Sequence, residues 1–122
     1  MHRVAQSKFG SRGNCFAACI ASILDVQIDT IPDVASYVDW LEYFNVWLED
    51  VYGLSYVEIS IPKDRKPDDI LKGYHVIVGD SPRGSCRHAI VGYNGLSYYD
   101  PHPANTMVCG DIVYGIFIKL FK

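Results

Sequence analysis

The sequence predicts an α+β fold, with helices in the first half of the chain and a mostly antiparallel β-sheet in the second. Small and apolar residues cover most sides of a helical segment that begins at Cys15, which indicates a central, buried helix. From Val57 onward, apolar residues instead alternate with polar ones or form short β-branched runs bounded by glycine. We therefore expect a Cys-bearing helix packed on the sheet of a single domain that spans residues 1–122.

The composition is typical of a globular domain. Of the 122 residues, 49% are hydrophobic and 20% are charged, which is far from the composition of disordered proteins. A net charge of −3 offers no electrostatic reason to bind nucleic acid, which requires clustered Lys and Arg. The sequence shows neither an apolar leader nor an apolar run of about 18 residues. We therefore expect no membrane association, a cytoplasmic location and reduced cysteines.

Breaker and capping residues predict where the first two helices begin. The polar N-terminal segment ends at Gly13 and is expected to be a loop. Asn14 is then placed to cap a helix over residues 15–25. Further along, Thr30 followed by Pro32 predicts the start of a second, short helix.

A third helix is expected to follow Asp39, which is placed to cap it, and to end at Gly53 in a left-handed conformation. Apolar residues recur through this segment at helical spacing, at Leu41, Phe44, Trp47, Leu48 and Val51. Its aromatic residues either line a substrate groove or belong to the core, and they are Trp40, Tyr43, Phe44 and Trp47.

The second half of the chain predicts a sheet. Strands are expected near residues 57–61, 74–78, 88–93, 96–100 and 112–121. Asn94 and Gly95 favour the two positive φ angles of a type I′ turn, so they predict a tight hairpin between the third and fourth strands. The charged connector between the first two strands is expected to contain a single helical turn at residues 67–71.

The hairpin and the central helix together predict a candidate catalytic site. His88 begins one hairpin strand and Asp100 ends its partner, so the two are expected to be cross-strand neighbours. A carboxylate that binds one imidazole nitrogen fixes the tautomer and leaves the other nitrogen for a third group, here Cys15. The start of a helix, with its unpaired N–H groups and partial positive charge, favours a thiolate at Cys15. We expect a thiolate–imidazolium pair that attacks carbonyl carbons.

Attack on a carbonyl also requires hydrogen-bond donors for the substrate oxygen. The backbone N–H of Cys15 and the side-chain amide of Gln6 are the expected donors. Asn14 and His102 are the candidate substrate-binding residues, because Asn14 precedes the nucleophile and His102 is held between two prolines just past Asp100.

An upstream Gln6, Cys15 at the start of a buried helix, His88 at the start of an apolar strand and Asp100 before proline in the partner strand together resemble the papain-like fold. The resemblance is closest to the compact bacterial branch that contains the double-glycine leader peptidases of bacteriocin exporters. It implies that Cys15 is the nucleophile, His88 the general base and acid, Asp100 the orienting residue and Gln6 the oxyanion donor.

One spacing departs from that family. Its glutamine usually lies closer to the cysteine than the nine residues that separate Gln6 from Cys15 here. Either a longer loop brings Gln6 back to the site, or Asn14 or Ser11 takes its place. Residues 14–24 also resemble a group of small bacterial and phage proteins of unassigned role, which name no substrate.

These expectations describe a cysteine-dependent hydrolase, a peptidase or isopeptidase, that cleaves an amide bond in a protein or peptide substrate and requires no cofactor. A deamidase or an acyl transferase would use the same three residues with a different leaving group or acceptor. A catalytically inactive binding module with the same fold is a further alternative.

The other cysteines leave open alternatives to catalysis. Cys19, one turn beyond Cys15, is expected in the core, or else as a redox partner. Cys86 and Cys109 are expected in loops or at strand ends. A zinc site made of Cys15, Cys19, Cys86 and His88 is chemically reasonable because thiolates and imidazole are preferred zinc ligands, although no metal belongs to the preferred interpretation.

Overall fold

The computed structural model describes residues 1–10, 13–34 and 37–120. Within these residues, the strands form one antiparallel sheet in the order β1-β5-β2-β3-β4. The strands are β1 (Leu54–Ile59), β2 (Tyr74–Asp80), β3 (Arg87–Tyr93), β4 (Leu96–Tyr99) and β5 (Cys109–Lys119). The helices are α1 (Cys15–Leu24), the 3₁₀ helix η2 (Ile28–Thr30), α2 (Trp40–Tyr52) and the single turn α3 (Pro67–Ile70). The predicted α+β class is confirmed.

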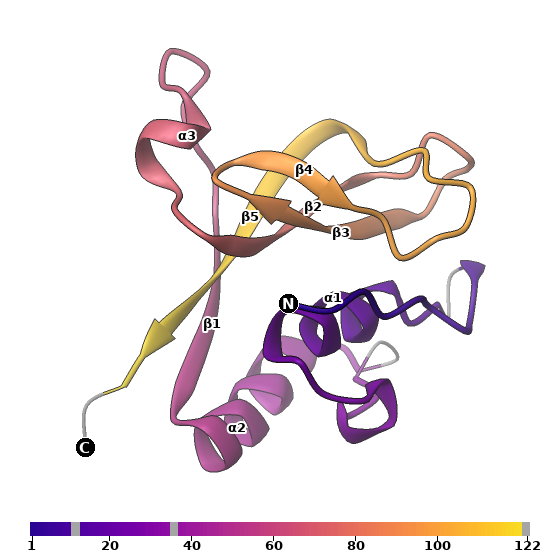
Figure 1. The fold of residues 1–122 in the computed structure, drawn as a ribbon, viewed down its shortest axis with the longest axis vertical. Helices are drawn as coiled ribbons and strands as arrows, with labels where there is room; N and C mark the ends of the chain where they lie inside the picture. Colours follow the sequence, from indigo (N-terminus) through magenta and orange to yellow (C-terminus); the bar gives the residue numbers. More distant parts are fainter. Residues whose placement is uncertain (11–12, 35–36, 121–122) are drawn as a thin grey trace.

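Figure 1 shows α1 and α2 on the same side of the sheet, with the N-terminal segment running past α1. Helix α1 packs against β3 and β2, and α2 packs against β1. Five consecutive residues of α1 are buried, from Ala18 to Ser22. This confirms the expectation of a central helix, and it places the Cys-bearing helix on the sheet.

Asn14 immediately precedes α1, as predicted, but its side chain makes no capping hydrogen bond. Its Oδ1 atom instead accepts hydrogen bonds from the backbone N–H groups of Ser7 and Lys8, both at 2.9 Å, and its Nδ2 atom donates to the Ser7 hydroxyl. The predicted capping bond does not form because the Asn14 side-chain amide is already hydrogen-bonded to the N-terminal segment. Asn14 thereby ties that segment to the start of α1.

The second predicted helix is also wrong. The helical turn η2 ends at Thr30, where a helix was expected to begin, and the described residues 31–34 are not helical. Ile31 has φ −87° and ψ 128°, an extended conformation. A residue that precedes proline is pushed out of the helical region by the proline ring, so Pro32 prevents continuation.

Helix α2 ends at Gly53, whose φ of 66° confirms the predicted left-handed end. Asp39 precedes the helix but makes no side-chain capping bond. Of the predicted apolar stripe, Phe44 and Leu48 are fully buried, whereas Leu41 and Val51 are exposed. The stripe therefore covers less of the core than its spacing indicated.

The hairpin of β3 and β4 is confirmed, with φ of 52° at Asn94 and 85° at Gly95. The turn is anchored from β2, because the Gly95 N–H donates to the Nε2 atom of buried His75 at 2.9 Å. The ladder also contains an irregularity that was not predicted. Gly92 pairs with Ser97 but Val91 pairs with Tyr99, so the register shifts by one residue.

Strand bounds differ modestly from those predicted. β1 begins at Leu54 and β5 at Cys109, both earlier than expected, and the predicted end of the last strand at residue 121 lies outside the described residues. In the part of the chain that the structure describes, none of the helices is both long and apolar enough to span a bilayer.

Gly115 on β5 is expected to be intolerant of a side chain. A Cβ atom at this position would overlap the Tyr56 hydroxyl, and Tyr56 is fully buried. We expect Gly115→Ala to lower the free energy of unfolding by about 1–3 kcal/mol, the usual cost of overpacking. Gly84→Ala is the matched control, since a Cβ there meets nothing within 4 Å. Equal denaturation midpoints for the two variants would contradict this packing.

Candidate active site

The structure brings Cys15, His88 and Asp100 together from three separate elements. Cys15 is the first residue of α1, His88 lies at the start of β3, and Asp100 follows the last residue of β4. The His88 Nε2 atom is 2.7 Å from the Asp100 Oδ1 atom, and both residues are only 4% exposed. The Cys15 and His88 side chains lie close enough for their interaction to lower the pKa of Cys15 and to raise that of His88. Because Nε2 faces Asp100, Nδ1 is the nitrogen left for the sulfur.

Asp100 is held as a charged acceptor. Its Oδ1 atom also accepts the backbone N–H of His102, and its Oδ2 atom accepts that of Met107, each at 2.9 Å. Burial raises the pKa of the Asp100 carboxyl, but the bonds to His88, His102 and Met107 outweigh it, so the net pKa lies below its ordinary value. An ionised, fully bonded carboxylate fixes the orientation of the imidazole and favours its protonated form.

Cys15 and His88 stabilise each other as ions. Burial raises the pKa of the Cys15 thiol, but hydrogen bonds from His88 and the Ala89 backbone, with the His88 charge, outweigh it and leave a lowered pKa. Burial lowers the pKa of His88, but Cys15 and Asp100 together raise it above its ordinary value. Both shifts favour the thiolate–imidazolium state relative to an isolated thiol and an isolated imidazole.

Cys19 differs from Cys15. It is fully buried, and burial together with the nearby Cys15 charge raises its pKa well above the ordinary value. It therefore stays a thiol within the core, in keeping with the expectation of a packing role.

Gln6 reaches the same site despite its distance in sequence. Its backbone N–H donates to the Pro101 carbonyl at 3.1 Å, and its Nε2 atom donates to the Lys8 carbonyl at 2.9 Å. The Lys8 carbonyl also accepts the Asn14 N–H at 3.2 Å, which closes the intervening loop. Gln6 lines a hollow together with Cys15 and His88. A longer loop thus returns it, whereas Ser11, the other donor considered, lies outside the described residues.

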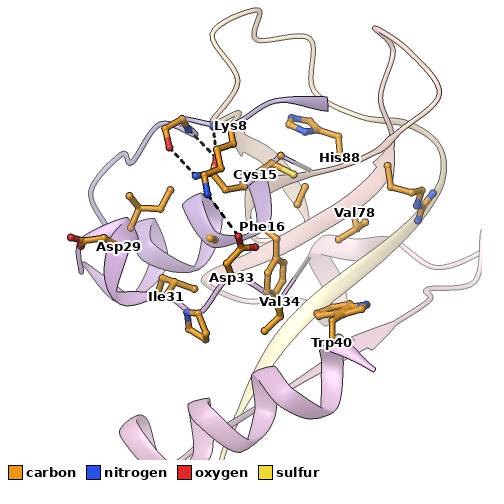
Figure 2. Close-up of a pocket in the computed structure, with 18 of the residues that line it drawn as sticks. Lys8, Cys15, Phe16, Asp29, Ile31, Asp33, Val34, Trp40, Val78 and His88 are labelled. Atoms are coloured by element: carbon orange, nitrogen blue, oxygen red, sulfur yellow. Dashed lines mark hydrogen bonds and ion pairs between the residues drawn. The ribbon is translucent and has the colours of Figure 1, made fainter. Parts of the chain in front are cut away.

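Two hollows of unequal size meet at Cys15 and His88. The larger is a groove of about 630 Å³. Figure 2 shows Phe16, Val34 and Trp40 in its lining, with Cys15 next to His88 at one part of the groove. Its other apolar side chains include Ile28, Ile31, Val78 and Val113, and its acidic ones are Asp29, Asp33 and Glu58. A concave, mostly apolar groove of this kind suits an extended or bulky apolar ligand.

The smaller hollow measures about 150 Å³ and has a different character. Its lining includes Gln6, Cys86, His102 and the two arginines Arg83 and Arg87. The His102 ring packs edge-on against His88, with 6.2 Å between ring centroids, and its Nδ1 atom accepts the Ala104 N–H. His102 is thus placed beside the His88 imidazole. Asn14 borders the large groove, but its bonded amide supports a role in holding the loop.

The four aromatic residues of the segment 40–47, for which the sequence left a groove or a core role open, have different surroundings in the structure. Trp40 lines the groove, Phe44 is fully buried, Tyr43 is exposed and Trp47 packs partly against the core. Sequence reasoning did not single out Phe16, whose ring contacts those of Trp40, Phe44 and Tyr56. The available signal was its position directly after Cys15, because the neighbour of a nucleophile at a helix start must also border the site.

Arg83 and Arg87 were also missed. Both lie within five residues of His88 in the chain, and that proximity was the available signal. Among the described residues, no cluster of three or more His, Cys, Asp or Glu side chains is arranged to hold a metal ion. The alternative zinc set of Cys15, Cys19, Cys86 and His88 is therefore not assembled there. Cys109 is exposed, and its sulfur lies 3.5 Å from the Asp80 carbonyl.

Comparisons of the chain with protein-family models, with curated proteins and with solved structures found no match. The function of the site must therefore be inferred from its residues and their geometry.

The ion pair predicts unusual reactivity at Cys15. Iodoacetamide should alkylate Cys15 with a pH midpoint below the roughly 8.5 of a free thiol such as N-acetylcysteine, because the thiolate persists to lower pH. Asp100→Asn should move this midpoint upward, since the imidazolium loses its carboxylate. Peptide mass spectrometry measures the rate at each cysteine, with exposed Cys109 reporting reagent access. A midpoint at Cys15 that equals the free thiol's would contradict activation.

Proposed function

We propose that this chain is a cysteine-dependent hydrolase with a papain-like fold, which cleaves an amide bond in a protein or peptide substrate. The observation that carries the proposal is the buried hydrogen bond between Asp100 and His88, with Cys15 close to His88 at the junction of two hollows. The lowered pKa of Cys15 and the raised pKa of His88 support a charged nucleophile–acid pair.

The reaction follows from the positions of these atoms. The Cys15 sulfur attacks the carbonyl carbon, and the electrons of the carbonyl bond move to its oxygen. As this tetrahedral species collapses, His88 gives its proton to the departing amine and an acyl-thioester remains on Cys15. His88, now neutral, takes a proton from a water molecule that attacks the thioester and releases the acid. Asp100 keeps the imidazole oriented through both steps.

The substrate oxygen requires donors at the start of α1. The Gln6 amide carries two N–H groups, one of which is bonded to the Lys8 carbonyl, so the second is available for the oxyanion. The backbone N–H of Cys15 is the second donor in this proposal. Within the described residues, the buried Oε1 atom of Gln6 has no hydrogen-bond partner. Buried polar atoms without a partner are few in folded proteins, and a functional role is one reason for their presence.

The papain-like assignment is supported by the order of elements. A cysteine opens a buried helix, and a histidine and an aspartate follow on an antiparallel sheet, with an upstream glutamine beside them. This order resembles that of the double-glycine leader peptidases. Deamidation and acyl transfer would proceed through the same thioester, so identification of the released product distinguishes them from peptide hydrolysis.

The proposed nucleophile is tested on proteins or peptides from a bacterial lysate. The purified chain should generate new peptide termini, which mass spectrometry of labelled N-termini detects. Cys15→Ala should abolish them, because no other group in the site replaces the thiolate. Cys109→Ser should leave them unchanged, because Cys109 is exposed and lines neither hollow. If Cys15→Ala retained the full biological effect of the protein, the site would be that of an inactive binding module.

Gln6→Met tests the oxyanion donor. This near-isosteric change removes both N–H groups, and we expect kcat/KM on a cleaved peptide to fall by about 100-fold, the usual cost of losing one such donor. The rate of Cys15 alkylation, measured in parallel, separates loss of the donor from loss of the nucleophile, and the thermal midpoint checks folding. Unchanged kcat/KM in a folded variant would assign the oxyanion to other donors.

A further inference from the structure

We propose that the small hollow is an anion-binding subsite, so that the substrate carries a carboxylate next to its scissile bond, on the side away from the apolar groove. This inference rests on the proposed function and names the chemistry of its substrate. It assigns Arg83 as the residue that determines this specificity. The supporting observations are the charges that line the two hollows and the bonds that hold them in place.

Two arginines, Arg83 and Arg87, line the small hollow together with His102, and its described lining contains no acidic residue. Arg83 forms no ion pair with any of the described carboxylates. Arg83 and His102 lie close enough that, after burial, the Arg83 charge is the next cause of the lowered pKa of His102. A carboxylate is the group that would neutralise this arrangement.

The arginines are held in position before any substrate arrives. Arg83 donates from Nη1 to the Thr106 hydroxyl. Arg87 donates from Nη1 to the Asp80 carboxylate and to the Asp111 carbonyl, both at 3.1 Å. The loop that carries Arg83 is closed by a hydrogen bond from the Ser81 N–H to the Cys86 carbonyl at 2.9 Å. Preorganised donors lose little conformational entropy when a ligand binds.

Asp80 partly neutralises Arg87, which also borders the large groove. Arg83 lines only the small hollow of the two, so its charge acts there. It is therefore the arginine whose removal tests the subsite.

The large groove has the opposite character. It is mostly apolar, and its rim carries Asp29, Asp33 and Glu58. Lys8 pairs with Asp33 at 3.8 Å, which leaves Asp29 and Glu58 as acidic groups that would repel an anion there. Cys15 and His88 border both hollows. A substrate whose carbonyl carbon lies at Cys15 therefore extends into the large groove on one side of the scissile bond and into the small hollow on the other. The apolar half fits the groove of about 630 Å³, and a small anionic half fits the hollow of about 150 Å³.

A pair of alkylating reagents tests whether the site at Cys15 prefers an anion, and the test does not require the natural substrate. Iodoacetate and iodoacetamide have similar size and the same leaving group, but only iodoacetate carries a charge. The ratio of their rate constants at Cys15, divided by the same ratio for N-acetylcysteine, reports the attraction of an anion to the site. We expect this normalised ratio to be well above one and to fall as salt is added, because salt screens the arginine charges.

Arg83→Gln isolates the subsite from the His88 imidazolium, which also attracts anions. We expect the normalised ratio to fall about fivefold in this variant, the size of effect that one nearby charge exerts in a partly solvated site. Arg83→Lys should retain most of the ratio. Arg65→Gln is the matched control, because it removes the same charge from an exposed connector that lines neither hollow.

A ratio that is unchanged in Arg83→Gln, with Cys15 still alkylated faster than Cys109, would overturn the subsite and leave the proposed hydrolase intact. Slow alkylation of Cys15 by both reagents would instead overturn the activated nucleophile itself. The two failures are therefore distinguishable.

Small ligands distinguish the source of the carboxylate. N-acetylglycine presents a terminal carboxylate beside an amide, and the α-methylamide of N-acetylaspartic acid presents a side-chain carboxylate. Protection of Cys15 against iodoacetamide by the first indicates that cleavage occurs next to a chain terminus, and protection by the second indicates an internal acidic residue. N-acetylglycinamide is the uncharged control, and protection by none of the carboxylates at millimolar concentration would overturn the subsite.

Discussion

The hydrogen bond between His88 and Asp100, buried and 2.7 Å long, is the interaction on which the site depends. It fixes which imidazole nitrogen faces Cys15, and together with Cys15 it raises the pKa of His88 above its ordinary value, against the effect of burial. The Asp100 carboxylate can do this because two backbone N–H groups also bind it, so burial does not neutralise it. The loop after β4 therefore serves the chemistry as directly as the helix that carries the sulfur.

The hairpin register decides whether this hydrogen bond can form. If the pairing of Gly92 with Ser97 continued regularly, Asp100 would lie opposite Ala89, whose side chain points to the other face from that of His88. The observed shift to the pairing of Val91 with Tyr99 interrupts that regular alternation, and Asp100, which follows β4, bonds His88. A slip of one residue exchanges the two faces of a strand, so this irregularity is a structural requirement of the site.

Local chemistry explains which predictions were confirmed. Asn94 and Gly95 adopt positive φ, and Gly53 ends α2, because glycine and asparagine tolerate these conformations wherever the chain turns. The position of Cys15 at a helix start likewise follows from the breakers before it and the apolar residues after it. The helix expected after Thr30 does not form in residues 31–34, although Ile31 before Pro32 has nearly the same extended angles as Lys66 before Pro67, where α3 does begin. The start signal alone therefore did not decide the outcome.

By itself, the sequence determined the α+β class, the helix start at Cys15 and the tight hairpin, because short-range backbone preferences and hydrophobic periodicity are properties of neighbouring residues. It brought His88 and Asp100 into one hairpin, but the register shift that sets their exact positions was not predicted. Only the tertiary structure decided that Asn14 binds the N-terminal segment instead of capping α1, that Gln6 returns to the site, and that Arg83 lines the same hollow as Cys15. These arrangements depend on contacts between residues far apart in the chain. Such contacts form only when the whole fold brings their partners together, and no local pattern encodes them.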